Sequence, residues 1–98
     1  MRLDLIKKRI RPVLNRRGVF KAALFGSAVR GEMRRGSDID LLIDLKEGGT
    51  LMDFVGLKLE LEEKLDRKVD LVEYAAIKPS LRALIFGEQK IIYEKKRP

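Results

Sequence analysis

In two stretches of the chain, apolar residues recur every three or four positions, and this spacing predicts helices. Over residues 3–16 they stand three or four positions apart, which is typical of a helix with one apolar face. Pro12 falls inside that stretch and has no backbone N–H to donate, so we expect a bend near Arg11 or a helix that stops early. Residues 51–65 repeat the helical spacing, and Thr50 with Asp53 three positions later is typical of a capping box.

Short apolar runs between turn residues predict strands at 19–25, 39–45, 68–74 and 90–93. We expect a helical turn at 27–32, a basic loop at 31–36, and a helix that begins at Pro79 and ends at Gly87. The order of these elements predicts an α/β (α+β) fold, with helices flanking a small mixed β-sheet of about four strands. The 98 residues suit a single domain, 1–98.

The apolar side chains of the helix at 51–65 are predicted to be core, with one exposed edge left for an interface. Tyr74 and Tyr93 are also expected to pack in the core. No apolar run approaches the ~20 residues of a membrane span, and we expect a cytoplasmic protein.

Composition narrows the chemistry. The chain contains no cysteine and no histidine, which excludes disulfides, thiolate zinc sites, and Cys or His catalysis. Metal or acid–base chemistry must therefore rest on carboxylates, which select hard ions such as Mg²⁺ or Mn²⁺. Residues 1–35 hold 11 basic and 2 acidic side chains, and this imbalance indicates either a polyanion nearby or a solvated basic surface.

The pair Asp38 and Asp40 stands at the start of a predicted strand. Side chains two positions apart on a strand point to the same face, so both carboxylates project together. Two like charges 4 Å apart repel by roughly 4 kcal/mol at an effective dielectric constant near 20. A divalent cation between them, or water around both, would relieve that repulsion.

Gly26-Ser27 follows the strand at 19–25 directly. Glycine lets the backbone approach a ligand closely, and free N–H groups with the Ser27 hydroxyl would make a site for an anion. A phosphate site and a metal site on neighbouring strands together predict a nucleoside triphosphate as ligand. Arg30 could contact a phosphate or hold the loop through a carboxylate.

The run from Gly26-Ser27 to Asp38 and Asp40 resembles the signature of the DNA polymerase β-like nucleotidyltransferase superfamily. Together with Arg30-Gly31 and Ser37-Asp38-Ile39-Asp40-Leu41, it resembles the minimal nucleotidyltransferases, the MNT-type antitoxins that are often paired with a HEPN-domain toxin. The resemblance implies a third acidic residue on a later strand, and Asp70 fits it. Asp70 stands among apolar residues, where an unpaired carboxylate would be costly, so we expect a metal or a basic partner beside it.

The resemblance also implies an activity and a partner. Two Mg²⁺ ions held by Asp38, Asp40 and Asp70 would support transfer of NMP, most plausibly AMP from ATP, to a hydroxyl of a partner protein. Gly26, Ser27 and Arg30 would bind the nucleotide, and the HEPN toxin would be the acceptor. The alternative is a binding antitoxin that masks its toxin without catalysis. We do not expect nucleic-acid binding, because the six aromatic residues are not arranged as a stacking platform.

Overall fold

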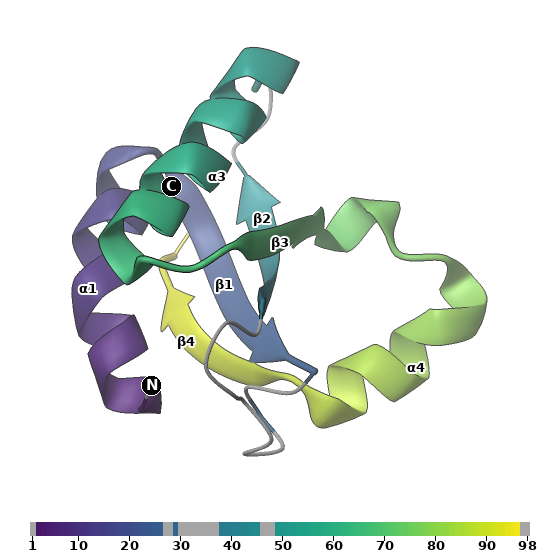
Figure 1. The fold of residues 1–98 in the computed structure, drawn as a ribbon. Coiled ribbons are helices and arrows are strands. Elements are labelled where there is room, and N and C mark those ends of the chain that lie inside the picture. Colours follow the sequence, from purple (N-terminus) through teal and green to yellow (C-terminus); the bar gives the residue numbers. More distant parts are fainter. Residues whose placement is uncertain (1, 27–28, 30–37, 46–48, 97–98) are drawn as a thin grey trace.

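A computed structural model describes residues 2–26, 29, 38–45 and 49–96. Four strands form one mixed sheet in the order β3-β2-β1-β4 (Figure 1). They are β1 (Val19–Phe25), β2 (Ile39–Leu45), β3 (Val69–Glu73) and β4 (Lys90–Glu94). β1 pairs antiparallel with β2 and β4, whereas β2 pairs parallel with β3. The predicted mixed four-stranded sheet is confirmed. The predicted turn at 27–32, apart from Val29, and the basic loop at 31–36 lie outside the described residues.

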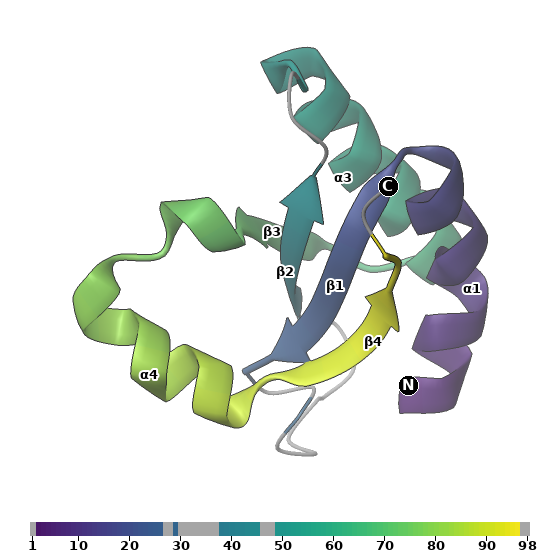
Figure 2. The ribbon, with the colours of Figure 1, turned by 180° about the vertical axis from the view of Figure 1, so that it is seen from behind.

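Two helices cover one face of the sheet and bury the main core. They are α1 (Leu3–Arg16) and α3 (Leu51–Leu65), which lie side by side in both views (Figures 1 and 2). Alternate residues of the strands point toward them, because side chains of a strand alternate between faces. The fully buried members of this core are Ile6, Ile10, Leu14, Val19, Ala22, Leu24, Ile39, Leu41, Ile43, Leu61 and Leu65.

The opposite face of the sheet is covered far less. It carries the short helix η1 (Tyr74–Ala76) and α4 (Pro79–Glu88), which has no buried residue. Within the described residues, the apolar cluster on this face has three buried members, Ala23, Leu42 and Ile77. The sheet therefore has one closed face and one largely open face.

α1 runs unbroken from Leu3 to Arg16, so the expectation that it stops early at Pro12 is wrong. Pro12 lies on the exposed side of α1. There the group left without a hydrogen bond by the missing N–H can turn to water. The buried side of α1, which includes Ile10 and Val13, holds the helix against the sheet on either side of the proline.

The capping box that the sequence predicts at the start of α3 is confirmed. The Asp53 backbone N–H donates to Thr50 Oγ1 at 3.1 Å, and the Thr50 backbone N–H donates to Asp53 Oδ2 at 2.9 Å. α3 ends where Asp66 adopts a left-handed conformation, with φ 53°.

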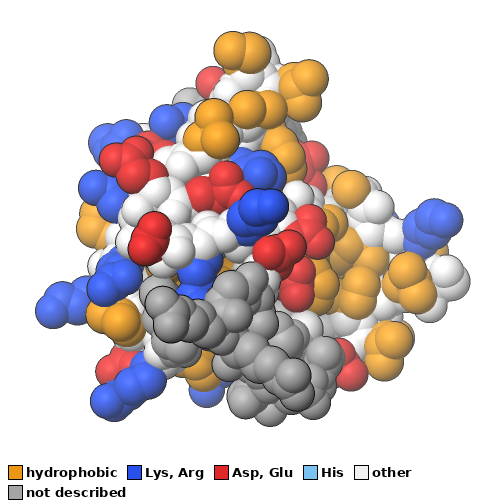
Figure 3. Space-filling model, viewed as in Figure 1, with side chains coloured by type: hydrophobic (Ala, Val, Ile, Leu, Met, Phe, Trp, Pro, Cys, Tyr) orange, Lys and Arg blue, Asp and Glu red, His pale blue; other side chains and the backbone are white. Residues whose placement is uncertain are grey.

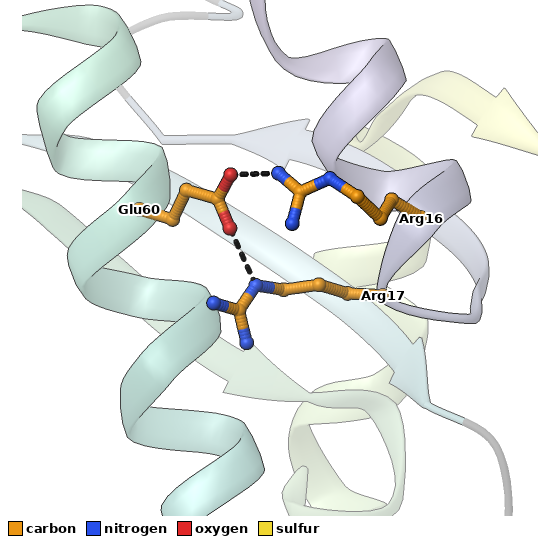
Figure 4. A network of polar contacts seen from close by, with 3 residues as sticks. All are labelled: Arg16, Arg17 and Glu60. Carbon is orange, nitrogen blue, oxygen red and sulfur yellow. Dashed lines mark hydrogen bonds and ion pairs between the residues drawn. The ribbon is translucent and has the colours of Figure 1, made fainter.

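An ion-pair network ties the end of α1 to the middle of α3 (Figure 4). Arg17 Nε donates to Glu60 Oε1 at 2.6 Å, and the Arg16 guanidinium pairs with Glu60 Oε2. The side chain of Glu60 is 16% exposed, so its charge is held mainly by the two arginines. This network fixes the two helices relative to each other at the end of the sheet opposite the acidic residues described next.

Candidate active site

Two predicted acidic residues meet on the open face of the sheet. Asp40 is the second residue of β2, Asp70 is the second residue of β3, and the two are register partners in the parallel pair. Neighbouring strands lie ~4.8 Å apart, and register partners point to the same side of a sheet. Ile39 and Leu41 point into the main core, so the alternating Asp40 faces away from α1 and α3.

Gly26 lies directly against Asp40. It follows the last residue of β1, Phe25, which is the antiparallel partner of Asp40. The φ of Gly26 is +70°, a conformation that residues with a side chain rarely adopt. A Cβ built on Gly26 would overlap Asp40 Oδ2 and lie 3.3 Å from Asp40 Cγ. The lack of a side chain at Gly26 therefore leaves room for the Asp40 carboxylate.

Asp38 lies just before β2 and is exposed. By the alternation of an extended chain it shares the face of Asp40, two positions away. Among the described residues, no three acidic side chains are gathered closely enough to form a metal site. The structure thus brings Asp40 and Asp70 onto one edge of the sheet, and Asp38 precedes Asp40 by two residues. Ser27 and Arg30 lie outside the described residues.

The surroundings of Asp70 differ from the expectation. Asp70 is exposed, and so burial does not require a metal or a basic partner to compensate its charge. The physical reason is topological: β3 stands at the edge of the described sheet, so β2 is the one strand that flanks Asp70. Both Asp40, which is half-buried, and Asp70 can therefore be reached by a ligand from the open face.

Tyr74 lies further along the same face, where it is half-buried and packs against the smaller apolar cluster of Ala23, Leu42 and Ile77. Its hydroxyl donates to Gln89 Oε1 at 2.5 Å, and its ring lies 5.5 Å from that of Phe86. Lys21 Nζ lies 5.2 Å from the ring centroid, within the range of a cation–π contact. Burial first, and then the charges of Glu94 and Asp44, raise the pKa of Tyr74 to about 12. Tyr74 is therefore a neutral anchor between the sheet and α4. Tyr93 is likewise partly buried and packs against the main core, so both tyrosines pack against apolar clusters as expected.

Known proteins share both this sequence and this fold. The family described as "Polymerase beta, Nucleotidyltransferase" matches residues 8–98, a range that includes every predicted site residue. A Methanocaldococcus jannaschii protein with a provisional assignment as a protein adenylyltransferase is 44% identical over 90% of this chain and 95% of its own length. The protein adenylyltransferase MntA of Thermococcus cleftensis is 38% identical over 84% of this chain and 80% of its own.

Solved structures agree with this assignment. A provisionally assigned minimal nucleotidyltransferase superimposes with a TM-score of 0.80 at 36% identity, covering 92% of this chain and 95% of that one. The Shewanella oneidensis complex of an MNT antitoxin with its tri-AMPylated HEPN toxin gives a TM-score of 0.72 at 21% identity, over 94% of this chain and 72% of that one. At that identity the second likeness concerns the fold alone. The chain belongs to the polymerase β family of nucleotidyltransferases.

Proposed function

We propose that this chain is a Mg²⁺-dependent protein adenylyltransferase that transfers AMP from ATP to a hydroxyl of a HEPN-domain toxin, and so acts as its antitoxin. The observation that carries the proposal is the register pairing of Asp40 with Asp70, beside the Gly26 backbone, on the open face of the sheet. The relatives named as protein adenylyltransferases support the choice of AMP and of a protein acceptor. We propose that residues 1–98 act as one domain and that the reaction takes place in the cytoplasm.

The donor set at this edge fits a hard divalent cation. Asp40 and Asp70 offer carboxylate oxygens from adjacent strands, and Asp38 offers a third carboxylate two positions away. Mg²⁺ is commonly held by one or two protein carboxylates together with phosphates and water, and the same ligands accept Mn²⁺. The family is typically metal-dependent. We propose Asp38, Asp40 and Asp70 as ligands of two ions, which when bound would neutralise phosphate charge and lower the pKa of the acceptor hydroxyl.

The residues of the chain would bind and orient the two substrates. Gly26, with Ser27 and Arg30, would take the phosphates of ATP beside the carboxylates, since glycine allows close backbone approach. The acceptor oxygen would bond to the α-phosphorus while the bond from that phosphorus to the bridging oxygen breaks. Pyrophosphate would leave, and the hydroxyl proton would pass to solvent. The acceptor has to approach the open face, because α1 and α3 close the other one.

The contrasting function is a binding antitoxin without catalysis. One observation favours it: among the described residues, no three acidic side chains lie close enough together to hold a metal ion. The variant Asp38→Asn/Asp40→Asn separates the two functions. In a ribonuclease assay of the HEPN protein with ATP and Mg²⁺, we expect this variant to bind the toxin but leave it active. Neutralisation by the variant at the wild-type dose would refute the catalytic proposal.

A further inference from the structure

The N-terminal half of α3 is apolar on its outer side as well as on the side that faces the sheet. Its outward-facing Leu51, Met52, Val55 and Leu59 are 76%, 78%, 39% and 58% exposed, and we call these four residues the α3 stripe. Hydrophobic side chains gather over this end of α3, which projects beyond the sheet (Figure 3). A helix that is apolar all round is normally buried, so the stripe indicates a surface that another molecule covers. The prediction that Leu51 belongs to the core is therefore wrong, because its side chain is exposed.

A groove continues the α3 stripe toward the edge of the sheet. It encloses about 390 Å³ between the start of α3 and the β3–η1 segment, and its lining includes Leu51, Phe54, Leu71, Val72, Glu73 and Ala76. Among the described residues, β3 pairs with a strand on one side only, with β2, and on its other side the Val69 N–H donates to Glu62 Oε2 at 2.9 Å. Beyond Val69, this outer edge can offer backbone groups to a ligand. The groove can therefore take both apolar side chains and an extended segment.

One lining residue of the groove, Val72, is close to the candidate active site along β3. Val72 stands two residues after Asp70 on β3 and points to the same face of the sheet. Two residues of strand span ~7 Å. A segment lying in the groove would therefore bring its neighbouring residues to the open face beside Asp70.

We propose that the α3 stripe and this groove form the docking surface for the protein that supplies the acceptor hydroxyl. This inference rests on the proposed function. The partner presents an apolar helix or segment, with basic residues at the end that lies over the exposed Glu63 of α3 and the exposed Asp66 that caps the helix. Those two carboxylates continue the line of the stripe toward the C-terminal end of the helix, and Glu73 adds a third acidic group in the groove.

A second copy of the chain fits this surface less well. With a net charge of +7, two copies repel each other. An antiparallel pair of α3 helices would also place the Glu63 carboxylate of each copy beside the exposed apolar side chains of Leu51 and Met52 of the other copy. A stable interface buries about 800 Å² on each partner, more than four side chains supply, so the occupant must enter the groove as well.

Calorimetric binding to a HEPN-domain protein tests the proposal. Leu51→Glu/Leu59→Glu changes two exposed positions, and Glu suits a helix as well as Leu does. Leu84→Glu on α4, where Leu84 is 61% exposed, is the matched control. We expect at least a tenfold loss of affinity for the stripe variant, an equal rise in the KM for the HEPN protein with kcat retained, and no change for the control. Circular dichroism melting verifies that both variants fold.

The outcomes separate this inference from the proposed function. Loss of binding in the stripe variant supports the docking surface even if the wild type transfers no AMP, a result that would refute the proposed function alone. If the stripe variant keeps the wild-type affinity and KM for the HEPN protein, the docking surface is overturned. AMP transfer by the same proteins would still support the proposed function. If light scattering shows that the wild type is a dimer and the stripe variant a monomer, the docking surface would also be overturned, and the stripe would be assigned to contact with a second copy. A wild type that does not bind the HEPN protein overturns both.

Discussion

Replacing Gly26 by alanine is the smallest change that disturbs the candidate active site. The new methyl group would overlap Asp40 Oδ2, and the φ of +70° would force an L-residue into the left-handed region. Gly87→Ala is the matched control, because a Cβ there meets nothing within 4 Å and Gly87 lies inside α4. The two variants add the same atoms in opposite settings.

The structure sets the size of each effect. The left-handed conformation costs an alanine roughly 1–2 kcal/mol, and displacing the Asp40 carboxylate adds to that loss. A domain of this size loses roughly 4–8 °C of Tm for each kcal/mol, so we expect Gly26→Ala to melt about 10 °C lower. Gly87→Ala should gain roughly 0.5–1 kcal/mol through helix propensity.

Activity should fall further than stability does. A misplacement of about 1 Å at a catalytic group can cost 100-fold in rate, so Gly26→Ala should lose about two orders of magnitude in AMP transfer at a temperature where it is fully folded. Thermal melting and a quantitative transfer assay of both variants provide the measurement. A Gly26→Ala protein with wild-type melting and transfer would refute the packing of Gly26 on Asp40.

Three further changes test the fold. Thr50→Ala removes one side of the capping box with Asp53 and should cost about 1 kcal/mol in denaturant unfolding; an unchanged midpoint would mean that the box contributes nothing. Glu60→Gln removes the anion that Arg17 binds and should cost about 1–2 kcal/mol, an effect that high salt should reduce. Tyr74 keeps its proton in the folded chain up to a pKa of about 12, whereas the unfolded chain loses it near 10. Its contribution to stability is therefore complete below pH 10 and is lost as the pH rises toward 12, and Tyr74→Phe should abolish that loss in pH-dependent melting.

The sequence predicts those parts of the fold that depend on local physics. The capping box at Thr50 and the four short apolar runs are local signals, and the structure has each of them where the pattern indicates. Of the two outcomes expected at Pro12, the early stop is wrong, because a local rule about hydrogen bonding does not include the packing that holds α1 on both sides of the proline. The expected bend near Arg11 stays a prediction.

Long-range pairing is what the sequence could not supply. That Asp40 and Asp70 are register partners follows from the parallel pairing of two strands separated by a whole helix, and no local pattern encodes it. The exposure of Asp70 and of Leu51 likewise depends on which strand lies at the edge and on how far α3 projects beyond the sheet. The resemblance to the family, carried by Gly26, Asp38 and Asp40, supplied the chemistry that these local signals lack.

The most direct test of the central claim measures which phosphate of labelled ATP is transferred to the HEPN protein. The HEPN protein is incubated with this chain and Mg²⁺, in parallel with ATP labelled at the α-phosphate and ATP labelled at the γ-phosphate. The account predicts label on the HEPN protein from the α-labelled nucleotide alone, and none when Asp38→Asn/Asp40→Asn replaces the wild type. Label from the γ-phosphate, or no label from either nucleotide, would contradict it.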